Sequence, residues 1–231
     1  MKAHIITILG HTLSEVGAEN CIKSSEELNN PFEIKSFEAC TPIDVGDVMN
    51  EYGLHWNFPW EGQVRDIKSG LTLNAYRTQD HLARMACALS HYVLWQKCQN
   101  ENKPLLILEH DAIFRYRLDP TFILKSKYNV VGLNDPIGAT RKANLFKTKV
   151  ENSEKDIVPV PHVDSFEIPQ GLAGNSAYII KPAGATALIA AVEEYGLWPN
   201  DAIMCRQLIK KLGVTRKFYT LVQGLPSTTT E

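Results

Sequence analysis

The sequence lacks the short glycine motifs that mark many nucleotide-binding and hydrolytic enzymes. None of its 14 glycines is followed by lysine, so a P-loop is absent. No two glycines are spaced two residues apart, which removes the GxGxxG fingerprint of dinucleotide-binding folds. The GxSxG elbow of serine hydrolases is missing as well. A nucleotide or catalytic site in this chain must therefore be built from other residues.

Cysteine is scarce, and long apolar runs are absent. The five cysteines are an odd number without the close spacing of a zinc knuckle or a redox pair, which favours free thiols in a reducing compartment. The longest apolar stretches, such as residues 185–192, fall far short of the roughly 20 residues that span a bilayer. The first four residues lead directly into an apolar strand without a signal-peptide cleavage site. We expect a soluble protein in the cytoplasm of a bacterium or of a virus-infected cell.

Neither sign of charge is in clear excess. Lysine and arginine number 24 against 26 aspartates and glutamates, a net charge of −2, so no overall basic field indicates nucleic acid or an anionic membrane. A local basic patch would still allow DNA as a substrate. Hydrophobic residues make up 44% and charged residues 22% of the chain, which is the composition of an ordinary globular protein.

Apolar periodicity predicts one α/β domain. Apolar, β-branched runs predict strands, at residues 4–9, 32–37, 104–108, 129–133, 176–180 and 215–222. Helical spacing predicts helices, at residues 14–28, 78–99 with Thr78 as cap, 182–195, and 199–212 closed by Gly213. Residues 41–76 are expected to form a long irregular loop, a type of segment that is usually functional. The alternation of strands and helices in the first half indicates a mainly parallel sheet, and no linker divides residues 1–231.

The sharpest motif is Glu109-His110-Asp111, which directly follows a buried strand. Ligands of open α/β sheets bind beyond the carboxyl ends of strands, where two acids can present oxygens to a divalent cation that bridges phosphates. Such a cation stabilises the negative charge that develops on a departing diphosphate. The alternative is a pair of structural acids that cap a helix or pair with Arg115 and Arg117.

A second feature lies on the predicted helix 78–99. Ser90 and His91 are neighbours there, and Trp95 follows His91 at helical spacing on the same face. These side chains either reach a nucleotide or sugar at the adjacent strand end or belong to a core helix with an internally bonded histidine.

A third feature precedes the strand 176–180. Gly171 and Gly174 are three residues apart, and Asn175 follows them. Glycine permits close backbone approach or a positive φ, which suits the floor of a sugar pocket and equally suits a tight turn into a strand.

In this order, the three segments resemble glycosyltransferase family 25, which includes lipopolysaccharide and procollagen galactosyltransferases. The order and spacing agree over residues 78–205, and the matching pieces are Cys87, Ser90, His91 and Trp95, then residues 105–111, then residues 171–180. The resemblance implies a single-domain, Rossmann-like fold of GT-A type with a mixed sheet flanked by helices. It also implies a UDP-sugar donor, a divalent cation (Mn²⁺ or Mg²⁺) and inverting transfer to a hydroxyl of a lipooligosaccharide-type saccharide. Residues 1–133 would bind the nucleotide-sugar, and residues 134–231 would bind the acceptor and close over the donor.

The resemblance also assigns site residues. Asp111 would be the metal ligand, together with Glu109 as the first acid of the motif. The donor would be bound by Leu9, His11, Thr12, Ser90, His91, Glu109, Gly174 and Asn175. His110 stands where the family usually has another acid, which reduces the local negative charge. The turn after the first strand also differs, because the family has Asn, Leu and Arg there.

A base is needed to take the proton of the acceptor hydroxyl. Asp201, at the start of the predicted helix 199–212, is the first candidate, and its alternative role is to stabilise the amide dipoles of that helix. Asp164 is the second candidate, with His162 beside it. Three tryptophans, Trp56, Trp60 and Trp198, are candidates for stacking on the acceptor, or else they anchor a core.

Two other functions remain open at this point. Arg141, Lys142, Lys147 and Lys149 form a basic segment, which would suit a viral glycosyltransferase that modifies hydroxymethylated bases in DNA. A non-catalytic nucleotide-sugar binder would explain His110 in the acidic motif, and a phosphoesterase is disfavoured because only one acidic pair is evident. Residues 226–230 form either a frayed end or a tail that folds over the nucleotide. The sequence indicates no obligate protein partner.

Overall fold

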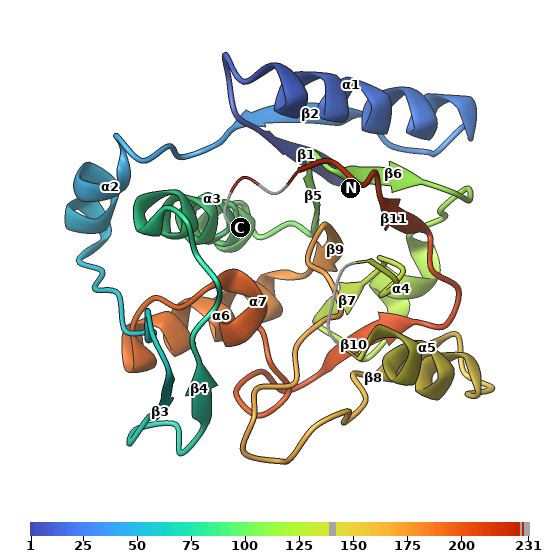
Figure 1. Cartoon of the computed structure of the whole chain (residues 1–231). Coiled ribbons are helices and arrows are strands. Elements are labelled where there is room, and N and C mark those ends of the chain that lie inside the picture. The colour runs from blue at the N-terminus through green and yellow to red at the C-terminus, as the bar shows by residue number, and fades with distance from the viewer. Residues whose placement is uncertain (139–141, 227, 229–231) are drawn as a thin grey trace.

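A seven-stranded sheet forms the centre of the protein (Figure 1). The computed structural model describes residues 1–138, 142–226 and 228. In spatial order the strands are β2 (Ile34–Glu38), β1 (Lys2–Thr7), β5 (Leu105–Glu109), β9 (Ala177–Ile180), β7 (Val130–Gly132), β10 (Leu212–Thr215) and β8 (Ile157–Pro159). Helices flank this mixed sheet, so the predicted α/β class is confirmed.

The strand directions explain where the site forms. β1 runs parallel to β2 and β5, but β9 lies antiparallel between β5 and β7. The prediction of a mainly parallel sheet was therefore wrong for the middle of the sheet. Because β9 runs opposite to β5, the start of β9 lies beside the end of β5, and the Glu109 amide donates to the Ser176 carbonyl at 2.8 Å. The glycine-containing segment and the acidic motif thus meet at one edge.

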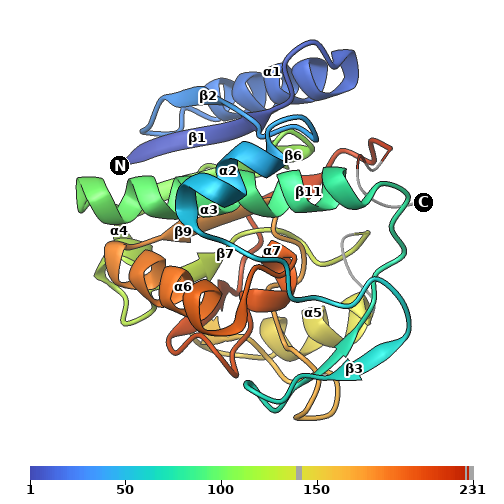
Figure 2. The same ribbon diagram turned by 90° about the vertical axis from the view of Figure 1, so that its left-hand side faces the viewer.

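Each face of the sheet packs against its own layer. Along β5, Leu105 and Ile107 lie in one core, while Leu106 and Leu108 lie in the other, as the two-residue period of a strand requires. The first core is covered by α2 (Val45–Tyr52), α3 (His81–Glu101), α6 (Pro182–Tyr195) and α7 (Asn200–Ile203), seen from their side in Figure 2. The second is covered by α1 (Thr12–Glu27), α4 (Thr121–Lys125) and the strand pair of β6 (Ala112–Phe114) and β11 (Thr220–Val222). Burial on both faces accounts for the unbroken apolar sequence of β5.

The remaining elements lie in segments where the sequence predicted none. The expected irregular loop 41–76 contains α2 and a hairpin of β3 (Gln63–Arg65) and β4 (Thr72–Asn74). The polar stretch 134–170 contains α5 (Ala143–Glu151), whose Phe146 and Val150 pack into the first core, and β8. No helix in the described ranges is both long and apolar enough to cross a membrane.

The predicted helix 199–212 was wrong beyond its first turn. Only α7 is helical, and Gly213 lies inside β10, paired with Val131 and Pro159. A side chain at position 213 would come within 2.7 Å of the Tyr128 ring, so this glycine allows the ring to pack on the strand. Glycine thus serves close packing here, whereas the sequence suggested a helix end.

The start of α3 lies two residues later than the prediction. Asp80, not Thr78, is its N-cap, and the Asp80 carboxylate accepts from the amides of Leu82 at 2.8 Å and Ala83 at 3.1 Å. Thr78 instead donates to the carbonyl of Tyr76.

Replacing this cap should destabilise the protein measurably. Asp80→Ala is expected to lower the free energy of unfolding by about 1 kcal/mol, because two helix amides lose their acceptor. Urea unfolding followed by circular dichroism measures the loss, with Gln79→Ala, an exposed neighbour, as the control. Equal stability of the two variants would contradict the cap.

Candidate active site

Two cavities lie side by side at the edge where β5 ends. The central cavity, of about 530 Å³, is lined by Cys87, Glu109, Asp111 and Asn175 among others. The side cavity, of about 550 Å³, lies between residues 74–77 and residues 161–173. Arg84 and Asp201 line both cavities, so these two side chains mark the boundary between them.

The two carboxyl groups of the acidic motif have different surroundings. Burial alone would raise the pKa of Glu109, but the hydrogen bond with His91, the charges of His91 and His110 and a smaller contribution from Asn200 together hold this pKa below its ordinary value. Burial, reinforced by the charge of Glu109, raises the pKa of Asp111 to about 7, although a hydrogen bond with Ser176 opposes the rise. The Oδ1 atom of Asp111 is buried and has no hydrogen-bond partner among the described residues. Glu109 is thus a fixed anion, and Asp111 has an oxygen left for a ligand.

Asn175 is a second buried group with unused hydrogen-bonding capacity. It is 5% exposed and lines the central cavity, and within the described chain neither its Oδ1 nor its Nδ2 has a partner. Gly174 before it has φ +82°, a conformation that places the following amide side chain at the turn into β9. A buried amide without partners costs free energy unless a ligand bonds to it.

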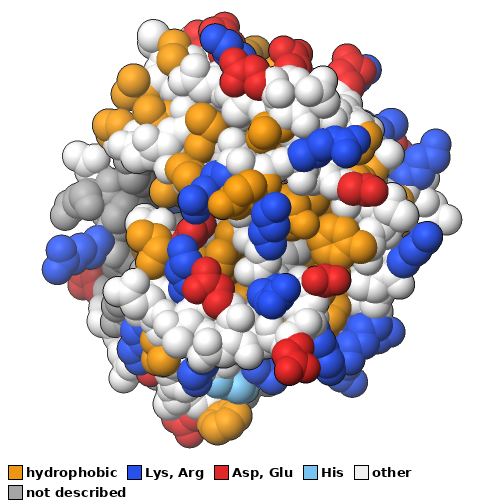
Figure 3. Space-filling model, turned by 90° about the vertical axis from the view of Figure 1, so that its right-hand side faces the viewer, with side chains coloured by type: hydrophobic (Ala, Val, Ile, Leu, Met, Phe, Trp, Pro, Cys, Tyr) orange, Lys and Arg blue, Asp and Glu red, His pale blue; other side chains and the backbone are white. Residues whose placement is uncertain are grey.

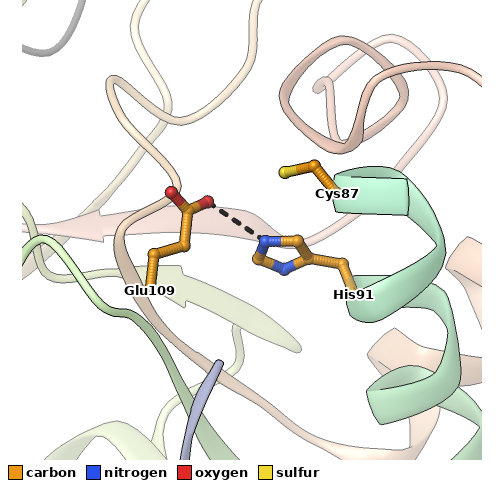
Figure 4. A group of neighbouring side chains, drawn as sticks. All are labelled: Cys87, His91 and Glu109. Carbon is orange, nitrogen blue, oxygen red and sulfur yellow. Dashed lines mark hydrogen bonds and ion pairs between the residues drawn. The ribbon is translucent and has the colours of Figure 1, made fainter. Parts of the chain in front are cut away.

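The helix face of α3 contributes two predicted residues in different ways. The Ser90 hydroxyl accepts from the Cys40 amide and donates to the Ala86 carbonyl, both at 2.9 Å, so it holds the wall of the cavity in place. His91 is fully buried, and its Nε2 lies 3.0 Å from Oε1 of Glu109 (Figure 4).

Cys87, His91 and Glu109 also form a group of potential metal ligands (Figure 4). One ligand atom from each lies within 4.8 Å of the others. Burial, together with the nearby charge of Glu109, raises the pKa of the Cys87 thiol, which disfavours the thiolate that metals bind. Both ring nitrogens of His91 are engaged in hydrogen bonds, to Tyr178 and to Glu109. The donor chemistry therefore fits a hydrogen-bonded group here, while the bare oxygen of Asp111 fits a hard cation better.

The two candidate bases lie in or beside the side cavity. Burial raises the pKa of Asp201, and neighbouring Arg84 opposes this shift; the Tyr76 hydroxyl also bonds to the carboxylate. Asp164 forms an ion pair with Lys142 at 2.8 Å. His162 does not line either cavity as described, and its ring packs against Phe166.

Glycine at position 171 brings α7 to the site. A side chain there would collide with the Asp201 backbone carbonyl, so the absence of one lets residues 170–172 approach α7. The sequence suggested such a close approach at this glycine without indicating its partner.

The predicted acceptor-binding tryptophans lie away from both cavities. The Trp198 side chain is 0% exposed to solvent and packs in the hydrophobic core. Trp56 stacks on Trp60 with ring centroids 4.7 Å apart, and Trp60 stacks on His81 at 4.0 Å. These rings stack on each other rather than line either cavity as described.

The predicted N-terminal donor contacts also lie outside the lining of the central cavity. Leu9 is 56% exposed, Thr12 begins α1, and His11 caps that helix by accepting from the Ser14 amide. Ile6 and Ile8 line the cavity instead. The strand ends at Thr7, residues 9–10 form a turn and α1 begins at Thr12, so the chain turns away from the cavity after Ile8.

The basic segment is largely bonded within the protein. Lys142 pairs with Asp164, Lys147 pairs with the buried Asp135, and Lys149 donates to the His162 carbonyl. Arg141 lies outside the described residues. On the face shown in Figure 3, Lys and Arg side chains are interspersed with acidic and apolar ones and form no continuous basic field among the described atoms.

Several functional side chains were not singled out from the sequence. The Gln223 Nε2 donates to the carbonyls of Gly17, His110 and Ala112 at 2.8–3.1 Å. Its backbone amide donates to the Asp111 carbonyl at 2.8 Å, so Gln223 holds the acidic turn. Arg84, Tyr178 and Asn200 also surround the acidic motif. No spacing rule relates them to it, since only the fold brings them together.

Comparison with known families identifies the chain. The sequence model of glycosyltransferase family 25 (LPS biosynthesis protein) matches residues 57–204, more than half of the sequence. The chain belongs to glycosyltransferase family 25. The matched range includes α3, the acidic motif, the Gly171–Asn175 segment and α7. No curated protein matches the sequence.

Solved structures with a similar course of the chain include three glycosyltransferases. The apo structure of the bifunctional glycosyltransferase WbbM aligns with 92% of this chain and 38% of its own, at 12% identity and a TM-score of 0.44. Mouse xyloside xylosyltransferase 1 aligns with 88% and 79% of the two chains, at 10% identity and a TM-score of 0.43. A glycosyltransferase involved in glycosylation of the major capsid of PBCV-1 aligns with 98% and 95%, at 7% identity and a TM-score of 0.42.

The unpartnered Asn175 leads to a prediction about stability. Asn175→Leu should leave the free energy of unfolding unchanged or raise it by up to about 1 kcal/mol, because it removes polar atoms that gain nothing in the folded protein. Denaturant unfolding of the ligand-free protein measures this.

A matched control is available at Asn134. It is also buried, but its Nδ2 donates to the Asp135 carbonyl and its Oδ1 accepts from the Thr220 hydroxyl. Asn134→Leu should therefore cost about 1–3 kcal/mol. A similar loss for Asn175→Leu would mean that the Asn175 amide is bonded in the folded protein.

Proposed function

We propose that this glycosyltransferase binds a UDP-sugar in the central cavity and transfers the sugar to a hydroxyl of an acceptor held in the side cavity. The observation that supports this assignment best is the position of Asp201, which lines both cavities. The acidic motif lies on the central-cavity side of it. A sugar donor in the central cavity and an acceptor in the side cavity would both lie next to Asp201, whose carboxylate can accept a proton.

The central cavity fits a divalent cation in its donor set. Asp111 has a buried Oδ1 without a partner among the described residues, and burial, reinforced by the charge of Glu109, raises the pKa of its carboxyl. We assign Asp111 as the first cation ligand, with Glu109 as the second acid. When bound, Mn²⁺ or Mg²⁺ would stabilise the charge on the diphosphate as a Lewis acid. His110 in place of a third acid leaves this site with fewer anionic oxygens.

Asp201 is the proposed general base. Its carboxylate would take the proton from the acceptor hydroxyl while the acceptor oxygen bonds to the anomeric carbon and the bond from that carbon to the diphosphate oxygen breaks. Attack from the face opposite the leaving group inverts the anomeric configuration. The raised pKa of Asp201 brings the carboxyl closer to the pH at which a base works well, and Arg84 beside it keeps enough of it ionised.

The side cavity suits a saccharide. Phe58 and Tyr76 contribute aromatic rings to its lining, while Asn74 and Asp164 contribute polar groups suited to sugar hydroxyls. We therefore propose a saccharide of lipooligosaccharide type as the acceptor. DNA is less favoured because Lys142, Lys147 and Lys149 are bonded within the chain.

Removing the first cation ligand should abolish transfer. Asp111→Asn is expected to lower the rate of sugar transfer from UDP-glucose or UDP-galactose by at least about 100-fold, because the diphosphate loses its charge stabilisation. Transfer and donor hydrolysis are measured with Mn²⁺, Mg²⁺ or excess chelator. Asp119→Asn, at an exposed aspartate, is the control. Full wild-type activity in excess chelator would refute the metal assignment.

Replacing the proposed base should separate turnover from binding. Asp201→Asn is expected to lower kcat by about 100-fold or more, with the donor dissociation constant unchanged, since a base acts only in the chemical step. Asp164→Asn should mainly raise the acceptor KM. If Asp201→Asn lowers the melting temperature and leaves kcat near the wild-type value, Asp201 serves the helix start and not catalysis.

A further inference from the structure

A line of hydrogen-bonded side chains crosses the core between α3 and the sheet and ends at the acidic motif. The Trp95 indole Nε1 donates to the Tyr178 hydroxyl at 2.8 Å. The same hydroxyl lies 2.8 Å from Nδ1 of His91, and Nε2 of His91 lies 3.0 Å from Glu109. Trp95, Tyr178 and His91 are all 0% exposed, so water does not compete for these bonds. We refer to these four residues as the buried chain.

Donors and acceptors permit one arrangement of protons along the buried chain. The ionised Glu109 only accepts, so Nε2 of His91 must carry a proton. The Tyr178 oxygen already accepts from Trp95, and among the described residues its own proton has one acceptor within reach, Nδ1 of His91. In the Nε2–H tautomer of His91, Nδ1 accepts from the Tyr178 hydroxyl, and every bond in the chain points from Trp95 toward Glu109.

The far end of the buried chain touches the boundary between the two cavities. The Asn200 side chain in α7 also lies near Glu109 and contributes to the lowered pKa of that carboxyl. Asn200 is 7% exposed and directly precedes Asp201. A single carboxylate thus joins the end of β5 to the short helix that carries the proposed base.

We propose that His91 and Tyr178 are positioning residues of the transfer reaction: they fix the rotamer of Glu109 and, through Glu109 and Asn200, the place of α7. This inference rests on the proposed function, because it assigns the two ends of the buried chain to the donor and acceptor sides. Burying a histidine and a tyrosine hydroxyl in an apolar core costs desolvation free energy. When every member of such a network is hydrogen-bonded, the network is rigid, and here it would restrict the rotamer of Glu109. Tyr178 lines neither cavity, and His91 borders the central cavity with a side chain that is 0% exposed and bonded through both ring nitrogens, so we assign each a role through Glu109.

The key variant is Tyr178→Phe, which keeps the ring and removes only the hydroxyl. Without this donor, Nδ1 of His91 has no partner and the ring is free to change tautomer, which releases Glu109. We expect kcat to fall by about 10-fold or more, as for other residues that orient a ligand, while KM for the donor stays within about twofold.

Tyr92→Phe is the matched control. Tyr92, in α3, is also a buried tyrosine, and its hydroxyl accepts from Gln96 at 2.8 Å, outside the buried chain. Both variants lose one hydroxyl, but Tyr178→Phe also leaves Trp95 Nε1 and His91 Nδ1 without a partner and should lose more stability, so kcat is compared at a temperature where both variants are fully folded. Equal kcat values for the two would reduce Tyr178 to a purely structural role and overturn the proposal.

Conservative rescue tests His91 in the same way. His91→Gln keeps a donor toward Glu109 and an acceptor toward Tyr178, whereas His91→Leu keeps neither. We expect His91→Gln to retain about tenfold more kcat than His91→Leu at similar melting temperatures. Equal kcat for the two would contradict positioning through hydrogen bonds.

A spectroscopic test does not depend on activity. In the wild-type protein with ¹⁵N-labelled histidine, the His91 signal, assigned by its loss in His91→Gln, should show the Nε2–H tautomer; in Tyr178→Phe it should shift toward a mixture. A Nδ1–H tautomer in the wild type would overturn the buried chain. If that tautomer is found as expected but UDP-sugars are not turned over, the proposed donor fails while the hydrogen-bonded arrangement stands.

Discussion

The antiparallel placement of β9 beside β5 is the constraint on which the site depends. A parallel neighbour of β5 would place its own carboxyl end beside Glu109, whereas β9 begins there, anchored by the bond from the Glu109 amide to the Ser176 carbonyl. The turn into β9 therefore supplies Gly174 and Asn175 to the cavity in which Asp111 lies. The same strand carries Tyr178 under α3. The antiparallel direction of β9 therefore places both the cavity wall at Gly174 and Asn175 and the tyrosine that bonds to His91.

Low polarity around the acidic motif turns two similar carboxyl groups into different chemical groups. Glu109 bonds to His91, has Asn200 nearby and stays ionised despite burial, while Asp111 lacks a partner for one oxygen and holds its proton more strongly. A charge fixed by internal donors cannot easily reorganise around a ligand. Asp111, which has an oxygen without a partner, can reorganise around a ligand. The different roles of Glu109 and Asp111 therefore follow from the residues around them and not from the motif itself.

Apolar periodicity and turn residues predicted those parts of the site whose structure depends on neighbouring residues in the chain. The apolar run of residues 104–108 correctly placed Glu109 and Asp111 at a strand end, and residues 182–195 form the predicted helix. Gly213 was misassigned because glycine closes helices and also admits a ring against a strand, and only the position of Tyr128 distinguishes the two cases. Trp198 was misassigned because an aromatic residue near a loop has no local feature that separates core packing from ligand stacking. The relation of Tyr178 and Gln223 to the acidic motif depends on segments distant in the chain, which no periodicity encodes.

Gln223 has a consequence for the order of events during synthesis. Its side chain joins α1 to the turn after β5, and its backbone bonds to Asp111 in that turn, so residues from the first, middle and last parts of the chain meet at one amide. Strands β1, β2 and β5 can associate on a nascent chain as soon as they leave the ribosome. The acidic turn cannot reach its final shape until residue 223 has emerged as well. A partly made chain would therefore contain an ordered sheet edge but an unfinished acidic turn.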